Sequence, residues 1–168
     1  MKKILLALAF VFFAASASAQ GWALGARVTG GIQVQGEYQF ENENYIEGRL
    51  GLGLINGAGL DFTALHQWSV CKMEWTPRVG QWFFDAGVGA SVGMASKYIY
   101  VGATGCAKLG IEFNTAPVKL SLDYSPTIGP WVGSGKAVNA EGDNDTKLYS
   151  GIRTAGFLNF GISCVYCF

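Results

Sequence analysis

Apolar and polar residues alternate along most of this chain. Between residues 22 and 40 every even position is uncharged and most are apolar, whereas the odd positions include arginine, glutamate, glutamine and threonine. A period of two residues is typical of β-strands that have one apolar and one polar face. Two adjacent glycines interrupt this stretch, and we expect a three-residue turn at 29–31 that sets Val28 opposite Ile32.

The alternation continues in six further segments, with turn-forming residues between them. Together with the two strands of the first stretch, they predict eight strands of about 9 to 12 residues, a length that crosses a bilayer at a tilt. A hydrophilic stretch, 130–147, is predicted to form a long loop before the last strand. The six segments cover residues 46–54, 60–70, 82–94, 99–113, 118–124 and 152–168.

Composition decides which face of these strands is buried. Half of the 168 residues are apolar and only 14% are charged. The apolar face carries too many rings and branched side chains for the interior of an eight-stranded barrel, which holds little more than its own side chains. We therefore expect the polar face to fill the interior and the apolar face to contact lipid, in a closed sheet without unpaired edges. The predicted fold is all-β: an eight-stranded antiparallel up-and-down transmembrane β-barrel.

The first nineteen residues predict a cleavable signal peptide. Lys2 and Lys3 precede an apolar run over 4–13, and residues 17–19 are the small residues that signal peptidase recognises. The apolar run is too short to span a bilayer, which takes about 20 residues. We thus divide the chain into a signal peptide, 1–19, and a barrel domain, 20–168. The formal net charge is zero, and removal of the two lysines leaves a small negative charge, so no nucleic-acid partner is expected.

Aromatic residues are concentrated near strand ends that would share one rim of the barrel. Amphipathic rings favour the boundary between lipid and water, so we expect a membrane-interface belt there. An even number of strands places both termini at this rim, which we predict to be periplasmic. The predicted belt consists of Trp22, Tyr38, Phe40, Trp68, Trp82, Phe84, Phe113, Tyr166 and Phe168.

The end of the chain carries a family resemblance. The last strand ends in Phe168, with Tyr166, Ile162 and Phe160 on the same face, and it resembles the C-terminal assembly signal of outer-membrane β-barrels. Segments 86–90, 110–114 and 117–126 resemble the small eight-stranded outer-membrane β-barrel domain family of Gram-negative bacteria. The resemblance covers essentially all of 20–168.

The resemblance implies a location in the cell outer membrane. Its implied partners are outer-membrane lipids including lipopolysaccharide, the barrel-assembly machinery and periplasmic chaperones. It implies little about activity. Members of the family often carry arginine in the seventh and last strands, where this chain has Ser125, Val165 and Cys167, so part of the expected luminal charge network is missing.

Charged residues on the polar face nearly balance in sign. An unpaired charge in a narrow interior is costly, so we expect these residues to pair and to seal the lumen, with a conducting or substrate-binding path as the alternative. The predicted luminal charge network comprises Arg27, Glu37, Glu47, Arg49, Asp61, Asp85, Lys108, Glu112, Lys119, Asp123 and Arg153.

Catalytic and metal-binding patterns are weak. His66 is the sole histidine, and its place in the alternation (its parity, odd or even, along the strand) puts it on the outward face beside Trp68. Ser69 belongs to the opposite face. We therefore predict a rim residue rather than a catalytic group, no enzyme activity, no cofactor and no metal site. Of the four cysteines, parity places Cys164 outward and the other three, Cys71, Cys106 and Cys167, inward. All four are expected to be free, buried thiols.

The sequence thus predicts an integral outer-membrane barrel with a structural or surface-interaction role. The alternatives are a narrow outer-membrane channel, a lipid-modifying barrel enzyme and a soluble periplasmic ligand-binding barrel. Residues 130–147 are the external connection long enough to contact a surface partner, which the sequence does not identify. We expect a monomer.

Overall fold

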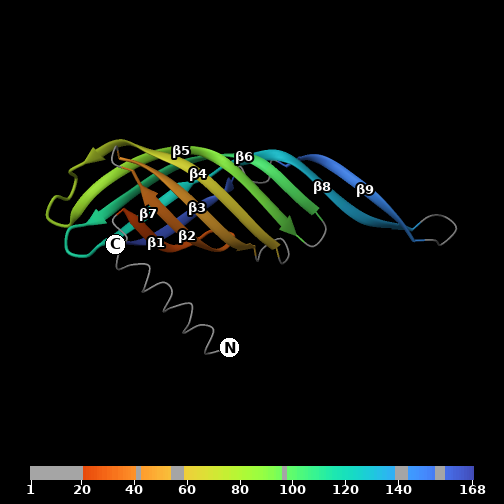
Figure 1. Ribbon diagram of the computed structural model, residues 1–168, viewed down its shortest axis with the longest axis horizontal. Helices are drawn as coiled ribbons and strands as arrows, with labels where there is room; N and C mark the ends of the chain where they lie inside the picture. The colour runs from red at the N-terminus through yellow and green to blue at the C-terminus, as the bar shows by residue number, and fades with distance from the viewer. Residues whose placement is uncertain (1–20, 41–42, 54–58, 96–97, 139–143, 154–157) are drawn as a thin grey trace, which may run out of the picture.

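The fold was obtained as a computed structural model, which describes residues 21–40, 43–53, 59–95, 98–138, 144–153 and 158–168. All regular structure in these ranges is β-strand (Figure 1). None of the described residues forms a helix long and apolar enough to cross a membrane. The strands are β1 Trp22–Val28, β2 Gly31–Gln39, β3 Asn44–Gly53, β4 Gly59–Met73, β5 Gly80–Ala95, β6 Tyr98–Phe113, β7 Val118–Tyr124, β8 Thr127–Val138, β9 Asn144–Arg153 and β10 Phe160–Cys167.

The strands close into an eight-stranded antiparallel barrel. Neighbours from β1 to β7 pair in chain order, and β10 lies between β7 and β1 to complete the ring. β7 and β8 pair with successive parts of β6, so they count as one interrupted barrel strand. β9 and β10 pair with β8 and β7 in turn, so they count as a second interrupted strand. The ten segments therefore make eight barrel strands, which confirms the predicted strand number and the all-β fold.

The turn between β1 and β2 has the predicted register. Val28 lies opposite Ile32, and the backbone N–H of Thr29 donates to the carbonyl of Gly31 at 2.9 Å. Because the turn spans three residues, even-numbered residues face outward in both β1 and β2, and odd-numbered residues face inward. Arg27 and Gln33 therefore share the inner face of the barrel.

The predicted loop at 130–147 is wrong. β8 runs through residue 138 and pairs with β9, from Gly129 opposite Arg153 to Val138 opposite Asn144. Glycines at 129, 133 and 135 obscure the alternation of β8, and Pro130 lacks the N–H that a ladder normally uses. The β8–β9 hairpin extends past the adjoining ends of β5 and β6 (Figure 1). The predicted last strand, 152–168, is correspondingly divided between β9 and β10.

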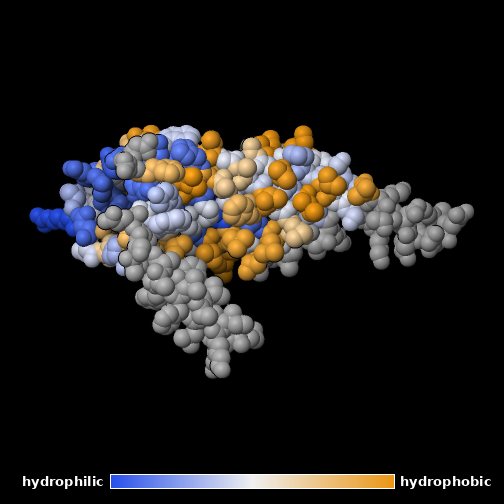
Figure 2. Space-filling model, in the orientation of Figure 1, coloured by the Kyte–Doolittle hydropathy of each residue, from blue (hydrophilic) through white to orange (hydrophobic). Residues whose placement is uncertain are grey.

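Polar side chains face the interior and apolar side chains face outward. On β2, Gln33, Gln35 and Glu37 are buried, whereas Ile32 and Val34 are more than half exposed. Apolar side chains cover much of the barrel wall, and hydrophilic ones gather at its left end (Figure 2). Burial in this barrel is therefore the reverse of that in a water-soluble domain, where large apolar side chains fill the core.

Some apolar side chains do lie inside. Leu65, Phe83 and Val165 are buried among the inward-facing residues. Leu65 has the parity of the polar face, so the alternation alone indicates its inward position, although its residue type does not. These side chains add apolar bulk to the mostly polar interior.

Candidate functional site

The first part of the charged interior is centred on Arg27 of β1. Its guanidinium Nη2 lies 2.6 Å from Oδ1 of Asp123 on β7, and Nε lies 2.9 Å from both carboxylate oxygens. Nη1 donates to Gln33 at 2.8 Å, and Ser163 donates to Asp123 at 3.2 Å. Arg27 and Asp123 are both fully enclosed, so this ion pair is screened from solvent.

Gly161 on β10 makes room for this guanidinium. A Cβ atom at position 161 would lie 2.4 Å from Nε of Arg27, closer than real Cβ contacts. Glycine is thus required here by the ion pair and not by backbone conformation.

We expect Gly161→Ala to lower the free energy of unfolding by about 1–3 kcal/mol, because Arg27 must move away from Asp123. Gly48→Ala is the matched control, since a Cβ at position 48 has no atom within 4 Å. Thermal unfolding of the two variants in detergent, followed by circular dichroism, measures the difference. Equal unfolding temperatures would contradict the packing described for Gly161.

The second part of the charged interior is centred on Lys108 of β6. Its Nζ lies 2.6 Å from Oε2 of Glu47 on β3 and 2.9 Å from Oε1 of Glu37 on β2. The same ammonium lies over the ring of Tyr45, 5.2 Å from the centroid, and the Tyr45 hydroxyl donates to Asp85 at 2.8 Å. One buried cation therefore bridges two carboxylates from neighbouring strands.

Arg49 connects the two parts. Its Nε donates to Glu47, and its Nη1 donates to Ser125 at 2.8 Å and lies 3.6 Å from Asp123. Its Nη2 contacts the Cys106 thiol at 3.4 Å. Side chains from β1, β2, β3, β6 and β7 thus form one connected polar network across the barrel interior.

Seven of the predicted luminal charges are buried in or beside this network: Arg27, Glu37, Glu47, Arg49, Asp85, Lys108 and Asp123. Asp61 is half-buried and accepts from Gln33 at 2.8 Å. Glu112 and Lys119 lie toward the end of the barrel at which β1 begins and β10 ends, which we call the terminal end. Their charged atoms are 3.9 Å apart. The side chain of Arg153 lies outside the described residues.

The predicted luminal charge network leaves out the neutral polar members of this network. Gln35, Gln67, Tyr45, Ser125 and Ser163 are buried and share the parity of the charged positions. Their positions in the alternation indicate that they face inward. The predicted network was restricted to charged residues, so these neutral side chains were left out of it. A further chain of hydroxyls, 2.5–2.9 Å apart, crosses β4, β5, β6 and β8. It consists of the buried Thr63, Ser91 and Thr104 and the partly buried Thr127.

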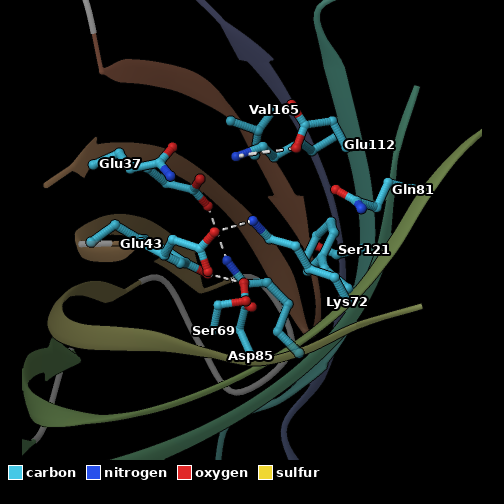
Figure 3. A pocket seen from close by; sticks show the side chains of 14 residues that line it. Glu37, Glu43, Ser69, Lys72, Gln81, Asp85, Glu112, Ser121 and Val165 are labelled. Carbon is cyan, nitrogen blue, oxygen red and sulfur yellow. Dashed lines mark hydrogen bonds and ion pairs between the residues drawn. The ribbon is translucent and has the colours of Figure 1, made fainter. Parts of the chain in front are cut away.

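The interior opens into a small cavity at the terminal end of the barrel (Figure 3). The ion pair between Glu43 and Lys72, 2.5 Å apart, stands on one side, and Glu112 stands on the other. Lys108 and Asp85 lie in its lining. Its volume of about 60 Å³ holds a few water molecules and is far below the roughly 300 Å³ of a small-molecule site.

Aromatic side chains form a continuous series of contacts at the same end. The ring of Trp22 lies 4.9 Å from Tyr38, which lies 5.4 Å from Phe40. His66 follows, 6.5 Å from Phe40 and 5.7 Å from Trp68. His66 thus belongs to an aromatic cluster on the outer surface.

The last residue of the chain lies beside the start of β1, next to these rings. The backbone N–H of Phe168 donates to the carbonyl of Trp22 at 3.0 Å, and the ring of Phe168 packs against Tyr166. Trp75, which the predicted belt omits, packs 5.3 Å from Trp82. Of the other belt members, Phe84 and Phe113 lie on β5 and β6 near the same end.

All four cysteines are free thiols, but the expectation that all of them are buried is wrong, because Cys71 and Cys164 are exposed. Cys106 is buried and Cys164 is exposed, as parity indicates, and Cys167 is partly buried. Cys71 is exposed, which corrects its predicted inward position. A register shift between Ser69 and Cys71 reverses the parity at the end of β4.

The described residues contain no group of three or more histidine, cysteine, aspartate or glutamate side chains placed to hold a metal ion. Comparisons of the chain with protein-family models, with curated proteins and with solved structures gave no match. The function is therefore argued from the barrel, its interior and its outer surface.

Proposed function

We propose that the chain is an integral outer-membrane β-barrel whose lumen is sealed by paired charges, with a structural or surface-interaction role. The observation that carries the proposal is the distribution of side chains: charged residues are buried inside, while apolar residues cover the outer wall. Val28, Ile32, Leu50 and Leu122 are each more than half exposed. An apolar surface that surrounds a barrel is stable in lipid and prone to aggregation in water.

The aromatic series at the terminal end supports a membrane interface there. Tryptophan and tyrosine favour the boundary between lipid and water, and the rings from Trp22 to Trp68 follow the strands around this rim. In this proposal the rim faces the periplasm, and residues 1–19 direct secretion. The partners are then outer-membrane lipids including lipopolysaccharide, periplasmic chaperones and the barrel-assembly machinery, which reads the last strand.

The packing of the interior supports a sealed lumen. Lys108, Arg49 and Arg27 lie on different strands and are each held by at least one carboxylate. Leu65 and Val165 add apolar bulk. A hydrated ion would have to displace buried ion pairs, and each displaced charge would lose its partner in a region of low dielectric.

Reconstitution into planar bilayers tests the sealed lumen. We expect the purified, folded protein to insert without producing large, stable conductance steps, because eight strands leave no open channel. An open porin recorded under the same conditions is the positive control, and a shift in electrophoretic mobility on heating shows that the inserted protein is folded. Reproducible conductance steps from the folded protein would favour the narrow channel instead.

A further inference from the structure

The buried charges of the barrel interior do not balance. Among the described residues, three buried side chains are cations and four are carboxylates. The cations are Arg27, Arg49 and Lys108, and the carboxylates are Glu37, Glu47, Asp85 and Asp123. An excess charge in a region of low dielectric is costly, so the network needs one more positive charge.

Asp85 on β5 is the buried carboxylate that lacks a cation. It is only 5% exposed, and no ion pair joins it to a lysine or arginine of the described residues. Its hydrogen-bond donor at 2.8 Å is the neutral hydroxyl of Tyr45 on β3. Ser69 of β4, also neutral, lies directly opposite Asp85 and forms a hydrogen bond with it (Figure 3). Neutral groups therefore hold this carboxyl.

Two of the lysines that line the small cavity with Asp85 are held by other carboxylates. Lys72 pairs with Glu43 at 2.5 Å. The ammonium of Lys119 lies 3.9 Å from Glu112. Neither lysine thus supplies the positive charge that Asp85 lacks.

The third lysine of the cavity, Lys108, lies directly opposite Asp85 in the register of β5 and β6. Its ammonium nonetheless extends across the interior to Glu47 on β3 and Glu37 on β2, at 2.6 and 2.9 Å. Glu37 has no other cationic partner among the residues that the structure describes. This position of Lys108 is the one that an ionised Glu37 and a neutral Asp85 would favour.

We propose that Asp85 carries a proton in the folded barrel at neutral pH. Three buried cations then face three ionised carboxylates, and the network is balanced. The carboxyl O–H donates to the Ser69 hydroxyl, while the other oxygen accepts from Tyr45. Loss of the proton in alkaline solution would attract Lys108 to Asp85 and leave Glu37 without a cation. Asp85 is thus a pH-sensitive switch at the terminal end of the barrel.

Infrared spectroscopy of the full-length protein, folded in detergent at neutral pH, tests the proton directly. A protonated carboxyl group has a C=O stretching band that is separate from the bands of carboxylates and of the backbone. We expect this band in the original chain and its loss in Asp85→Asn. Glu112→Gln is the matched control and should keep the band, because Glu112 lines the same cavity but its side chain is 52% exposed.

Two infrared results would overturn the proposal. The first is the absence of the band in the folded original chain, including a band that appears only after sodium and potassium ions are removed, since a metal cation would then balance the network. The second is a band that persists in Asp85→Asn. The first result needs no variant, so the proposal remains testable if Asp85→Asn does not fold.

The pH dependence of stability provides a second test. In the unfolded chain this carboxyl is ionised at neutral pH, so folding takes up a proton and the stability that Asp85 contributes falls as the pH rises. Between mildly acidic and mildly alkaline solution, we expect the unfolding temperature of the original chain to fall relative to that of Asp85→Asn. A constant difference between the two chains across this range would overturn the proposal. Neither test depends on the proposed membrane location, which reconstitution judges separately.

Discussion

Replacing Arg27 by alanine is expected to lower the free energy of unfolding by about 3–5 kcal/mol, because Asp123 then keeps a buried charge without its main partner. Both side chains are fully enclosed, so water cannot take the place of the guanidinium at low cost. Urea unfolding in lipid vesicles, followed by tryptophan fluorescence, measures the change.

The matched variant removes both charges. Arg27→Met combined with Asp123→Leu leaves no unpaired ion, and we expect it to be more stable than Arg27→Ala alone. A single substitution that costs less than 1 kcal/mol, near the value of an exposed ion pair, would contradict the enclosed pairing. Equal losses in the single and double variants would indicate that packing, and not the unpaired charge, causes the instability.

Replacing Leu50 by arginine is expected to lower the free energy of unfolding in bilayers by about 2–4 kcal/mol. Leu50 is 55% exposed on β3, on the outer wall of the barrel. If this wall contacts lipid, as we propose, a charged side chain there has to leave water for hydrocarbon. In a water-soluble barrel the same substitution at an exposed position would change stability by less than about 0.5 kcal/mol.

Val79→Arg is the control for Leu50→Arg. Val79 is 49% exposed, a similar fraction, but it lies in the turn that precedes β5 at the terminal end. We expect this substitution to leave stability almost unchanged, because its side chain remains in water. If both variants lost the same stability, or if neither did, the outer wall would not be in contact with lipid.

The direction of most side chains could be predicted because alternation is local. Arg27, Glu47 and Lys108 face inward and Val34 faces outward, as the period of two residues indicates. The number of strands followed from the same pattern. No long-range information was needed for either prediction.

The partners of the charged residues could not be predicted. Arg27 and Asp123 are 96 residues apart in sequence, and they meet because β10 is placed between β1 and β7. Lys108 reaches Glu37 and Glu47 across the interior from β6. Such contacts depend on how the closed barrel is staggered, which a single strand does not encode.

The errors arose where the alternation was weak or shifted. In β8, glycines take positions at which larger side chains would have marked the face, so a strand was predicted as a loop. At Cys71, one extra residue in β4 reversed the parity. Both are departures from regular pairing that become visible only when the neighbouring strand is known.

Fractionation of cells that produce this chain decides whether the barrel is an integral protein of the outer membrane, as we propose. After separation of inner and outer membranes on a density gradient, we expect the protein to remain in the outer-membrane fraction through a wash with alkaline carbonate. It should be released only by detergent and should run as a folded, heat-modifiable species. Recovery of folded protein in the soluble periplasmic fraction without detergent would rule out an integral membrane protein.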